Sequence, residues 1–169
     1  NVRVLNVERK AESPAICGAE FPEGCTTRAE AGNVVAVHGL VLDVDHWQKQ
    51  VPLAWSEIES ALSGMRAIVW TTFSATQEEM RYRVVIPLKT PMPPAKYKAL
   101  CHAINAGLRK SVSETTFNPG RLGFFSSVGT QKSRDVYTYK IFPGQRLDWA
   151  AMNLPDEEQR PRKVAPSVP

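Results

Sequence analysis

The chain has 169 residues, of which 43% are hydrophobic and 22% charged, a composition typical of one globular domain with a sizeable core. No run of about 18 apolar residues is present, so the sequence predicts no membrane-spanning helix. The net charge of +4 makes the chain mildly basic, which is compatible with nucleic acid as a partner.

Three cysteines, Cys17, Cys25 and Cys101, are odd in number and unevenly spaced. This pattern argues against a disulfide framework and suits the reducing environment of the cytoplasm. Cys17 and Cys25 also carry thiols that can bind zinc, although no second close pair follows them.

The N-terminal part of the chain is rich in loops. The sequence begins at Asn1 without a methionine or a signal-peptide pattern, so we expect a domain of a longer protein. Residues 1–6 are typical of a short strand or an arm. Residues 8–32 contain several prolines and glycines among polar residues, and a segment of this length predicts a binding loop or a wrap over the core.

A valine-rich run over residues 34–42 predicts an interior strand that ends in two acids, Asp43 and Asp45. Because side chains alternate across a strand, both carboxylates lie on one face, roughly 6.5–7 Å apart. Two neighbouring carboxylates repel each other unless a cation lies between them, and Mg²⁺ or Mn²⁺ prefers such oxygen ligands. Two solvated acids at a strand end explain the same pattern, so both interpretations stay open.

Helices and strands alternate in the segments after the acidic pair. Apolar residues at helical spacing predict a helix over residues 51–64. Residues 66–73 and 81–88 predict the two strands of a hairpin, with Pro87 marking the end of the second. After a Pro-rich connector, an apolar stripe predicts a second helix over residues 94–110.

The last third of the chain adds two more strands, predicted over residues 122–127 and 135–142, and a short helix over residues 147–154. The resulting order is strand, helix, strand, strand, helix, strand, strand. This order predicts an α+β fold, with helices packed on a mainly antiparallel sheet as in ferredoxin-like and RRM-like cores.

One domain is expected over residues 1–154, with its core at about residues 34–142 and a loop-rich N-terminal part. Residues 155–169 are charged and then Pro-rich, which is typical of a tail or linker.

Two further groups of polar side chains suit phosphate. Thr72 and Ser74 lie at the end of the first hairpin strand, and Arg81 and Arg83 share one face of the second. Guanidinium groups hold phosphate oxygens in bidentate fashion, and hydroxyl groups can donate to the same oxygens. A solvated sheet face is the alternative for the two arginines. The turn N-P-G-R presents Arg121, and by itself this is an ordinary turn.

Four sequence segments follow one another in order: V-L-D-V-D-H-W, A-I-V-W-T-T-F-S-A-T, R-Y-R-V-V-I-P-L-K-T-P and F-N-P-G-R-L-G-F-F. Together they resemble the primase–polymerase domain of the archaeo-eukaryotic primase superfamily, most closely the primase domains of phage and plasmid replication proteins. The resemblance covers about residues 34–127. Its most distinctive part is R-Y-R-V-V-I-P-L followed by P-x-x-Y.

The resemblance implies nucleotidyl transfer in DNA replication by a DNA primase or DNA-directed polymerase that uses nucleoside triphosphates. Asp43 and Asp45 would hold Mg²⁺ or Mn²⁺ for a two-metal in-line displacement on a DNA template. Arg83 and Arg121 match the basic positions that contact the triphosphate or the template. A helicase domain usually accompanies such a domain in the full-length replication protein.

Two parts of the pattern differ from the superfamily. Phe73 and Ala75 stand where histidines are expected, and Ser113 stands where a third metal-binding acid is expected. Glu114, the next residue, would complete the metal site if the register shifts by one.

The alternative function is that of a degenerate, non-catalytic primase-like domain that binds origin or single-stranded DNA. Basic residues would then supply phosphate contacts, with an affinity that falls steeply with salt. These residues are Arg81, Arg83, Arg121, Lys132 and Arg134. A rolling-circle initiator is disfavoured, because neither His38 nor His46 has a second histidine two residues away.

Overall fold

The computed structural model describes residues 5–6, 9, 13–25, 33–45, 53–125, 127–128 and 131–155. The start of the predicted first helix falls within residues 46–52 and so lies outside the described residues. The tail beyond Pro155 and the side chain of Lys132 also lie outside them. None of the helices in the described ranges is long and apolar enough to cross a membrane.

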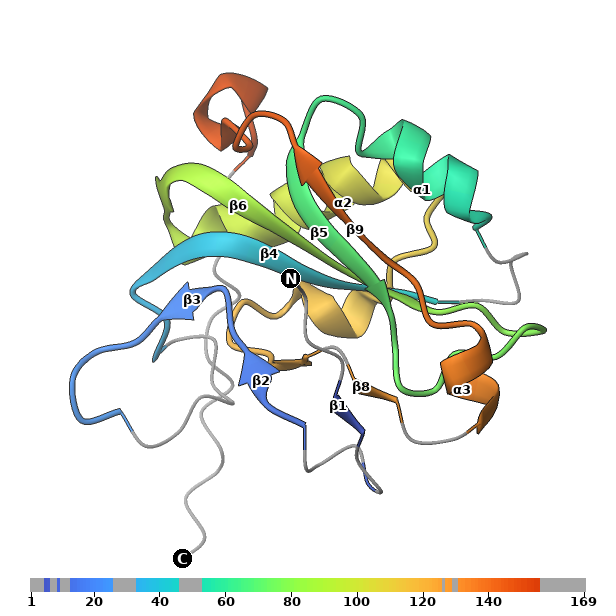
Figure 1. The fold of residues 1–169 in the computed structure, drawn as a ribbon. Coiled ribbons are helices and arrows are strands. Elements are labelled where there is room, and N and C mark those ends of the chain that lie inside the picture. Colours follow the sequence, from blue (N-terminus) through green and yellow to red (C-terminus); the bar gives the residue numbers. More distant parts are fainter. Residues whose placement is uncertain are drawn as a thin grey trace, which may run out of the picture.

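A five-stranded sheet forms the centre of the molecule (Figure 1). Every neighbouring pair of its strands is antiparallel. The strand order is β3 (Ala19–Glu20), β4 (Ala36–Val44), β6 (Tyr82–Met92), β5 (Arg66–Thr71) and β9 (Tyr139–Pro143). Helix α1 (Trp55–Ala61) connects β4 to β5, and helix α2 (Tyr97–Gly107) follows β6. The predicted α+β fold, with helices packed on a mainly antiparallel sheet, is confirmed.

Strands β4, β6 and β5 form a split β-α-β unit, in which β6 lies between the other two strands, as in ferredoxin-like folds. The predicted hairpin is present as β5 and β6. The last strand, β9, joins the sheet at the outer edge beside β5 rather than beside β4.

One face of the sheet carries the hydrophobic core. Because side chains alternate along a strand, every second residue of β4 and β6 points to this face, and most of these residues are apolar. They pack with buried side chains of α1 and α2. The core includes Leu40, Leu42, Tyr82, Val84, Ile58 and Leu100. The chain leaves α1 through Gly64, whose φ of 79° lies in the left-handed region that glycine tolerates.

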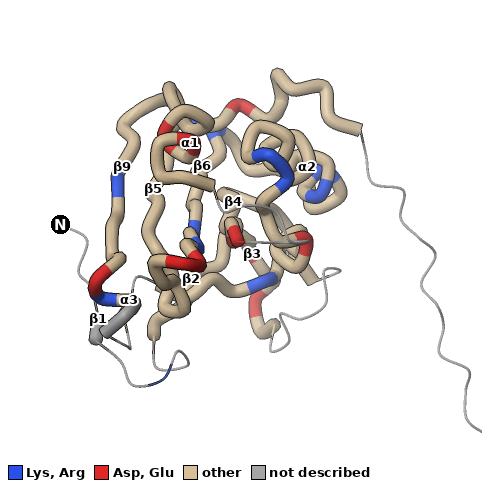
Figure 2. The backbone as a smooth tube through the Cα atoms, turned by 90° about the vertical axis from the view of Figure 1, so that its right-hand side faces the viewer, with Lys and Arg blue, Asp and Glu red and all other residues tan. Residues whose placement is uncertain are grey.

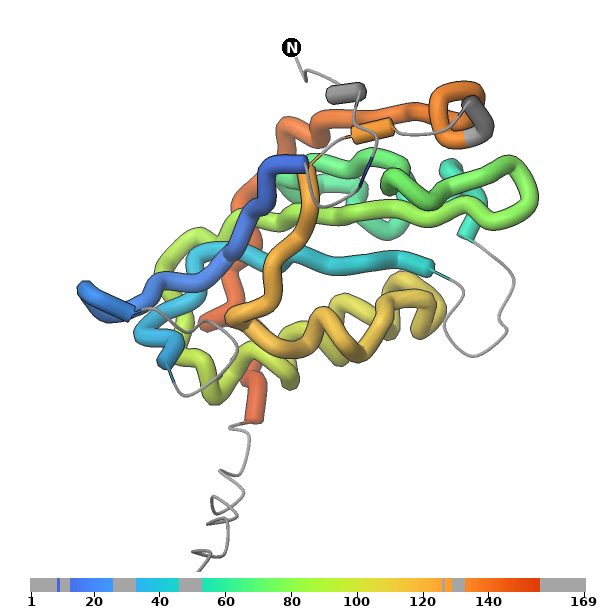
Figure 3. Tube along the Cα trace, turned by 90° about the horizontal axis from the view of Figure 1, so that it is seen from below, coloured from blue at the N-terminus to red at the C-terminus, as the bar shows by residue number. Residues whose placement is uncertain are grey.

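Short strands from distant parts of the chain lie on the opposite face of the sheet from α2 (Figure 3). β2 (Ala15–Ile16) pairs antiparallel with β7 (Gly123–Phe124), and β1 (Leu5–Asn6) pairs parallel with β8 (Ser127–Val128). The N-terminal segment therefore wraps over the sheet, which is one of its two predicted roles.

Strand β6 is longer than predicted, because it continues through Pro87 to Met92. Pro87 lies opposite Gly39, next to a shift in the register between β4 and β6. Proline is tolerated at such an irregularity. The Pro87 carbonyl also accepts a hydrogen bond of 3.1 Å from the Leu147 N–H, so the second half of β6 has an additional partner.

The strand predicted over residues 135–142 begins later, at Tyr139, and helix α3 (Gln131–Asp135) precedes it. Its neighbour β5 ends at Thr71, whose N–H donates to the Thr138 carbonyl at 3.0 Å. The residues before Thr138 therefore have no β5 residue to pair with, although their sequence alternates like a strand.

Other predicted elements are divided or shortened. The strand predicted over residues 122–127 consists of β7 and β8, which pair with N-terminal strands rather than with the central sheet. The predicted second helix is a 3₁₀ turn, η4 (Pro94–Lys96), followed by α2. The predicted last helix is one 3₁₀ turn, η6 (Trp149–Met152).

Candidate phosphate-binding pocket

A small pocket of about 60 Å³ lies where β4 ends and β6 begins. Six residues singled out in the sequence line it, together with Val44 and Tyr82. They are Asp43, Asp45, Thr72, Ser74, Arg81 and Arg83. The structure therefore brings together the acidic pair and the hydroxyl and arginine cluster that the sequence placed near each other.

An ion pair between Asp43 and Arg83 forms the floor of this pocket. The two residues lie directly opposite each other in the β4–β6 pairing, so their side chains share one face. The Arg83 side chain is only 4% exposed and that of Asp43 only 20%. Arg83 is therefore not part of a solvated sheet face, which was the alternative for it.

The surroundings of Arg83 act on its charge in opposite directions. Burial lowers the pKa of Arg83, and the nearby positive charge of Arg121 lowers it further, whereas Asp43 raises it by charge and by hydrogen bonding. Arg83 Nη1 also donates to the Phe124 carbonyl at 3.4 Å. These two partners hold the guanidinium between β4 and β7.

A segment after α2 pairs with the end of β4 that carries the acidic pair. Val112 forms an antiparallel bridge with Val44, and the Ser113 N–H donates to the Asp43 carbonyl at 2.8 Å. Ser113 therefore lies opposite Asp43, at the position where the superfamily pattern expects a third acid. Its side chain is buried and its Oγ lies 2.8 Å from Thr115 Oγ1.

Glu114 is not brought to the two aspartates. It is exposed at the start of η5 (Glu114–Phe117) and does not line the pocket. In the described part of the chain, no three His, Cys, Asp or Glu side chains are grouped to hold a metal ion. With Arg83 paired to Asp43 and Ser113 at the third position, the side chains present do not fit a two-metal centre.

Two arginine side chains present donors to the pocket. The Nε atoms of Arg81 and Arg83 are buried, and neither has a hydrogen-bond acceptor among the described residues. The outer end of Arg81 pairs with Glu79 Oε2 at 3.0 Å. Thr72 and Ser74 add hydroxyl groups to the same pocket. Guanidinium and hydroxyl groups suit an anionic oxygen ligand such as phosphate, and the carboxylates of Asp43 and Asp45 line the same pocket.

The positions where histidines were expected lie outside this lining. Ala75 is fully buried, and neither Ala75 nor Phe73 is among the pocket residues.

Two other predicted basic residues lie outside the pocket. Arg121 is exposed, and its Nη1 donates to the Thr115 carbonyl at 3.3 Å. Arg134 is exposed on α3. Figure 2 shows that the Lys and Arg positions are spread over β6, β9 and α2 in that view, with acidic positions among them. Of the basic residues predicted to contact phosphate, the described ones that come together in the pocket are therefore Arg81 and Arg83.

Sequence reasoning missed the residues that bury Arg83. Gly123 lies so close that a β-carbon on it would be 2.5 Å from Arg83 Nη1. A two-residue strand such as β7 has no periodicity of its own, so the only available signal was the glycine before two phenylalanines.

The family model of the VapE N-terminal domain matches residues 16–152, which is more than half of the chain. The chain belongs to this family. VapE N-terminal domains are found in replication-related proteins of phages and plasmids, which confirms the predicted setting of a mobile-element replication protein. Comparisons of this VapE N-terminal domain with curated proteins and with solved structures give no match. The primase superfamily itself stays a prediction.

Proposed function

We propose that this VapE N-terminal domain binds DNA through a backbone phosphate in the pocket, as a primase-like domain without two-metal catalysis. The observation that carries the proposal is the buried ion pair of Arg83 with Asp43, with Ser113 opposite Asp43. Two adjacent carboxylates require a nearby positive charge, and the guanidinium group already provides it.

The donors of the pocket support phosphate as the ligand. Arg81, Arg83, Thr72 and Ser74 line one small pocket, together with Asp43 and Asp45. In a replication-related protein the natural source of such a phosphate is single-stranded or origin DNA. The proposal includes action in the cytoplasm of a bacterial host and a helicase domain elsewhere in the full-length protein.

Fluorescence anisotropy with labelled single-stranded and origin DNA tests this proposal. We expect Arg81→Gln to weaken binding and to lower the slope of log affinity against log salt by about one. Arg66→Gln is the matched control, because Arg66 is exposed at the other end of β5. An affinity that does not change with salt, or equal effects of the two substitutions, would contradict the proposal.

A second candidate is nucleotidyl transfer by a DNA primase or primase–polymerase that uses Mg²⁺ or Mn²⁺ and nucleoside triphosphates. One observation favours it: Asp43 and Asp45 line the same pocket as the phosphate-binding groups. The ion pair of Asp43 with Arg83 argues against it.

Strand-synthesis assays with Mg²⁺ and with Mn²⁺ separate the two candidates. The first proposal expects no synthesis by the wild-type chain. It also expects metal binding to increase in Ser113→Asp, which places a third carboxylate opposite Asp43, as measured by calorimetry with Mn²⁺ alone. Synthesis by the wild type that is abolished in Asp43→Asn and Asp45→Asn would replace the first proposal with the second.

A further inference from the structure

The phosphate pocket is one end of a row of side chains that crosses the sheet. Asp43 lies opposite Arg83, Arg83 lies opposite Trp70, and Trp70 lies opposite Tyr139. Cross-strand partners point to the same face, so the row runs over β4, β6, β5 and β9 on the face away from the core. Tyr139 lies two strand spacings from Arg83, roughly 10 Å.

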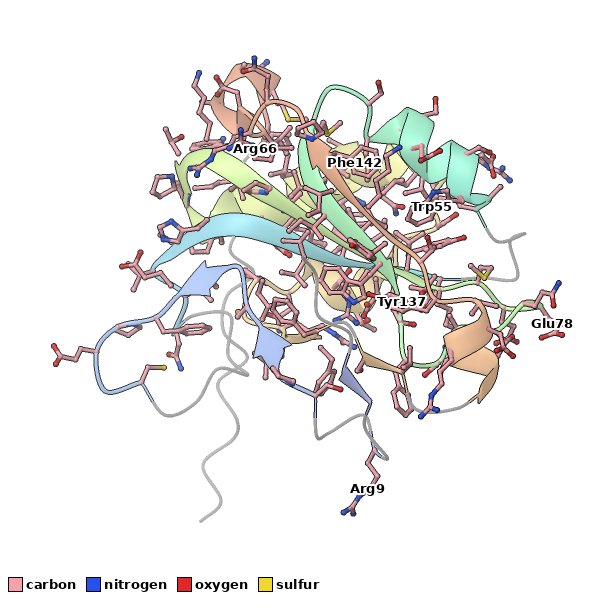
Figure 4. All side chains as sticks on the ribbon, in the orientation of Figure 1. Arg9, Trp55, Arg66, Glu78, Tyr137 and Phe142 are labelled. Atoms are coloured by element: carbon pink, nitrogen blue, oxygen red, sulfur yellow. The ribbon has the colours of Figure 1, made fainter. Side chains whose placement is uncertain are left out.

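Aromatic rings occupy the other end of this row. The Phe125 ring stacks on Trp70, with ring centroids 5.8 Å apart and an interplanar angle of 17°. Trp70 is 3% exposed beneath it, whereas Phe125 is 43% exposed. Tyr139 is 42% exposed, and its ring centroid lies 6.3 Å from that of Tyr137. Figure 4 shows Tyr137 at the end of the sheet distant from Arg66.

The segment that carries Phe125 is hydrogen-bonded to Arg83. Arg83 Nη1 donates to the carbonyl of Phe124, the residue before Phe125. On the far side, the Tyr137 N–H donates to the carbonyl of Arg134, whose side chain is exposed. Arg83 therefore connects the phosphate pocket to the segment that carries Phe125.

This arrangement matches the chemistry of single-stranded nucleic acid. Unpaired bases stack on exposed aromatic rings, while guanidinium groups hold the phosphates between them. A protein partner would also cover the apolar surface, but it would not need the arginine-lined pocket beside the rings. In a replication-related protein, a nucleic-acid strand is the occupant that uses both the pocket and the rings.

We propose that Phe125 and Tyr139 form a stacking platform for bases of single-stranded DNA whose phosphate occupies the Arg81–Arg83 pocket. The inference rests on the proposed function and adds a second, uncharged part to the binding site. Because aromatic rings stack on every base, the platform binds single strands with little sequence preference and excludes paired bases.

The test compares two probes of equal length and charge in anisotropy measurements on the 169-residue chain: a thymidine oligonucleotide and an abasic strand. We expect the wild type to bind the thymidine strand at least about five-fold more tightly, which is the lower end of the contribution of one stacked base. Phe125→Leu and Tyr139→Val should abolish that preference and leave the affinity for the abasic strand unchanged. Tyr139→Phe, which keeps the ring, should retain it.

Val35→Ala is the matched control, because Val35 is an exposed apolar residue outside the row. Circular dichroism of each variant shows whether its fold is retained. Equal binding of both probes by the wild type overturns the platform and leaves this face to a protein partner. If Arg81→Gln weakens binding while the preference is missing, only the platform fails; if no DNA binds at all, the proposed function fails with it.

Discussion

Arg83 is a charged residue in a position that most arginines avoid. Its side chain is almost fully buried, and Asp43 is the carboxylate that compensates its charge. Breaking such a pair is costly because the remaining partner keeps an uncompensated charge away from water, whereas removing both charges costs less. The pair therefore links the stability of the β4–β6 pairing to the charge of the pocket.

Replacing Arg83 alone should show this cost. We expect Arg83→Gln to lower the free energy of unfolding by about 3 kcal/mol, because Asp43 loses its partner. The double variant Asp43→Asn, Arg83→Gln should lose less than the sum of the two single variants. Urea unfolding of all four proteins gives the coupling energy, and purely additive losses would show that the two side chains do not stabilise each other.

A substitution at Gly123 tests how closely β7 approaches Arg83. Gly123→Ala should lower stability by about 1–3 kcal/mol, because the added methyl group meets both Arg83 and Val41. Gly107→Ala is the control, since a β-carbon at Gly107 meets no atom within 4 Å and lies at the end of α2. Thermal unfolding should separate the two variants, and equal stability would mean that β7 can move away at no cost.

At the scale of elements, the turn after α2 positions the strand-like segment that carries Ser113. Arg109 and Lys110 both have positive φ values, 52° and 60°, so the chain reverses sharply there. The side-chain oxygen of Asn105 accepts a hydrogen bond of 2.9 Å from the Val112 N–H, and both groups are buried. This contact connects α2 to the strand-like segment beside Asp43.

Removing the Asn105 acceptor should therefore disturb the segment that pairs with Asp43 and Val44. We expect Asn105→Leu to cost about 1–3 kcal/mol, because the Val112 N–H loses its acceptor in a buried site. The substitution should increase the rate of hydrogen exchange more at Ser113, whose N–H donates to the Asp43 carbonyl, than at Val84 in the centre of β6. A uniform change at both amides would contradict a local role for Asn105.

Local sequence patterns predicted the elements that carry their own periodicity. Alternation placed Asp43 and Asp45 on one face and paired residues 66–73 with 81–88, and both expectations hold in β4, β5 and β6. The ends of strands depend on partners instead. β9 starts at Tyr139, which pairs with Trp70 of β5. β6 continues beyond Pro87 because its residues Leu88 and Met92 pair with Leu147 and Val37.

The candidate site also has a part that local sequence patterns predicted and a part that they did not. Six of its eight lining residues were singled out from the sequence as candidate site residues. The burial of Arg83 and the place of Ser113 were not, because they depend on β7 and on the bridge of Val112 to Val44. These contacts join segments far apart in sequence, and nothing in the local pattern of either segment indicates them.

For the whole molecule, the packing of α2 on the sheet limits the stability of the fold at high pH. Burial raises the pKa of the Cys101 thiol to about 12 from an ordinary 9.0, and burial also raises the pKa of Tyr97. The unfolded chain loses these protons at lower pH than the folded chain does. These two groups therefore leave the stability unchanged below pH 9 and lower it as the pH rises from 9 towards 12.

Urea unfolding at pH 8 and pH 10.5 checks this expectation. The wild type should lose stability between the two values, on the order of 1.4 kcal/mol for each pH unit above the ordinary thiol pKa. Cys101→Ala, although less stable at pH 8, should show a smaller loss because it has no thiol to ionise. A loss of the same size in both proteins would assign the alkaline transition to other groups.

The pairing of β2 with β7 also has a consequence for how the chain folds. Ala15 pairs with Phe124, so the contacts that cover Arg83 join opposite ends of the domain. Loop closure over such a separation is entropically costly and slows folding. On the ribosome, β4 and β6 can pair before β7 has been synthesised, which leaves Arg83 and Asp43 in water. We therefore expect the pocket to reach its native, enclosed form late in folding, after the sheet that supports it.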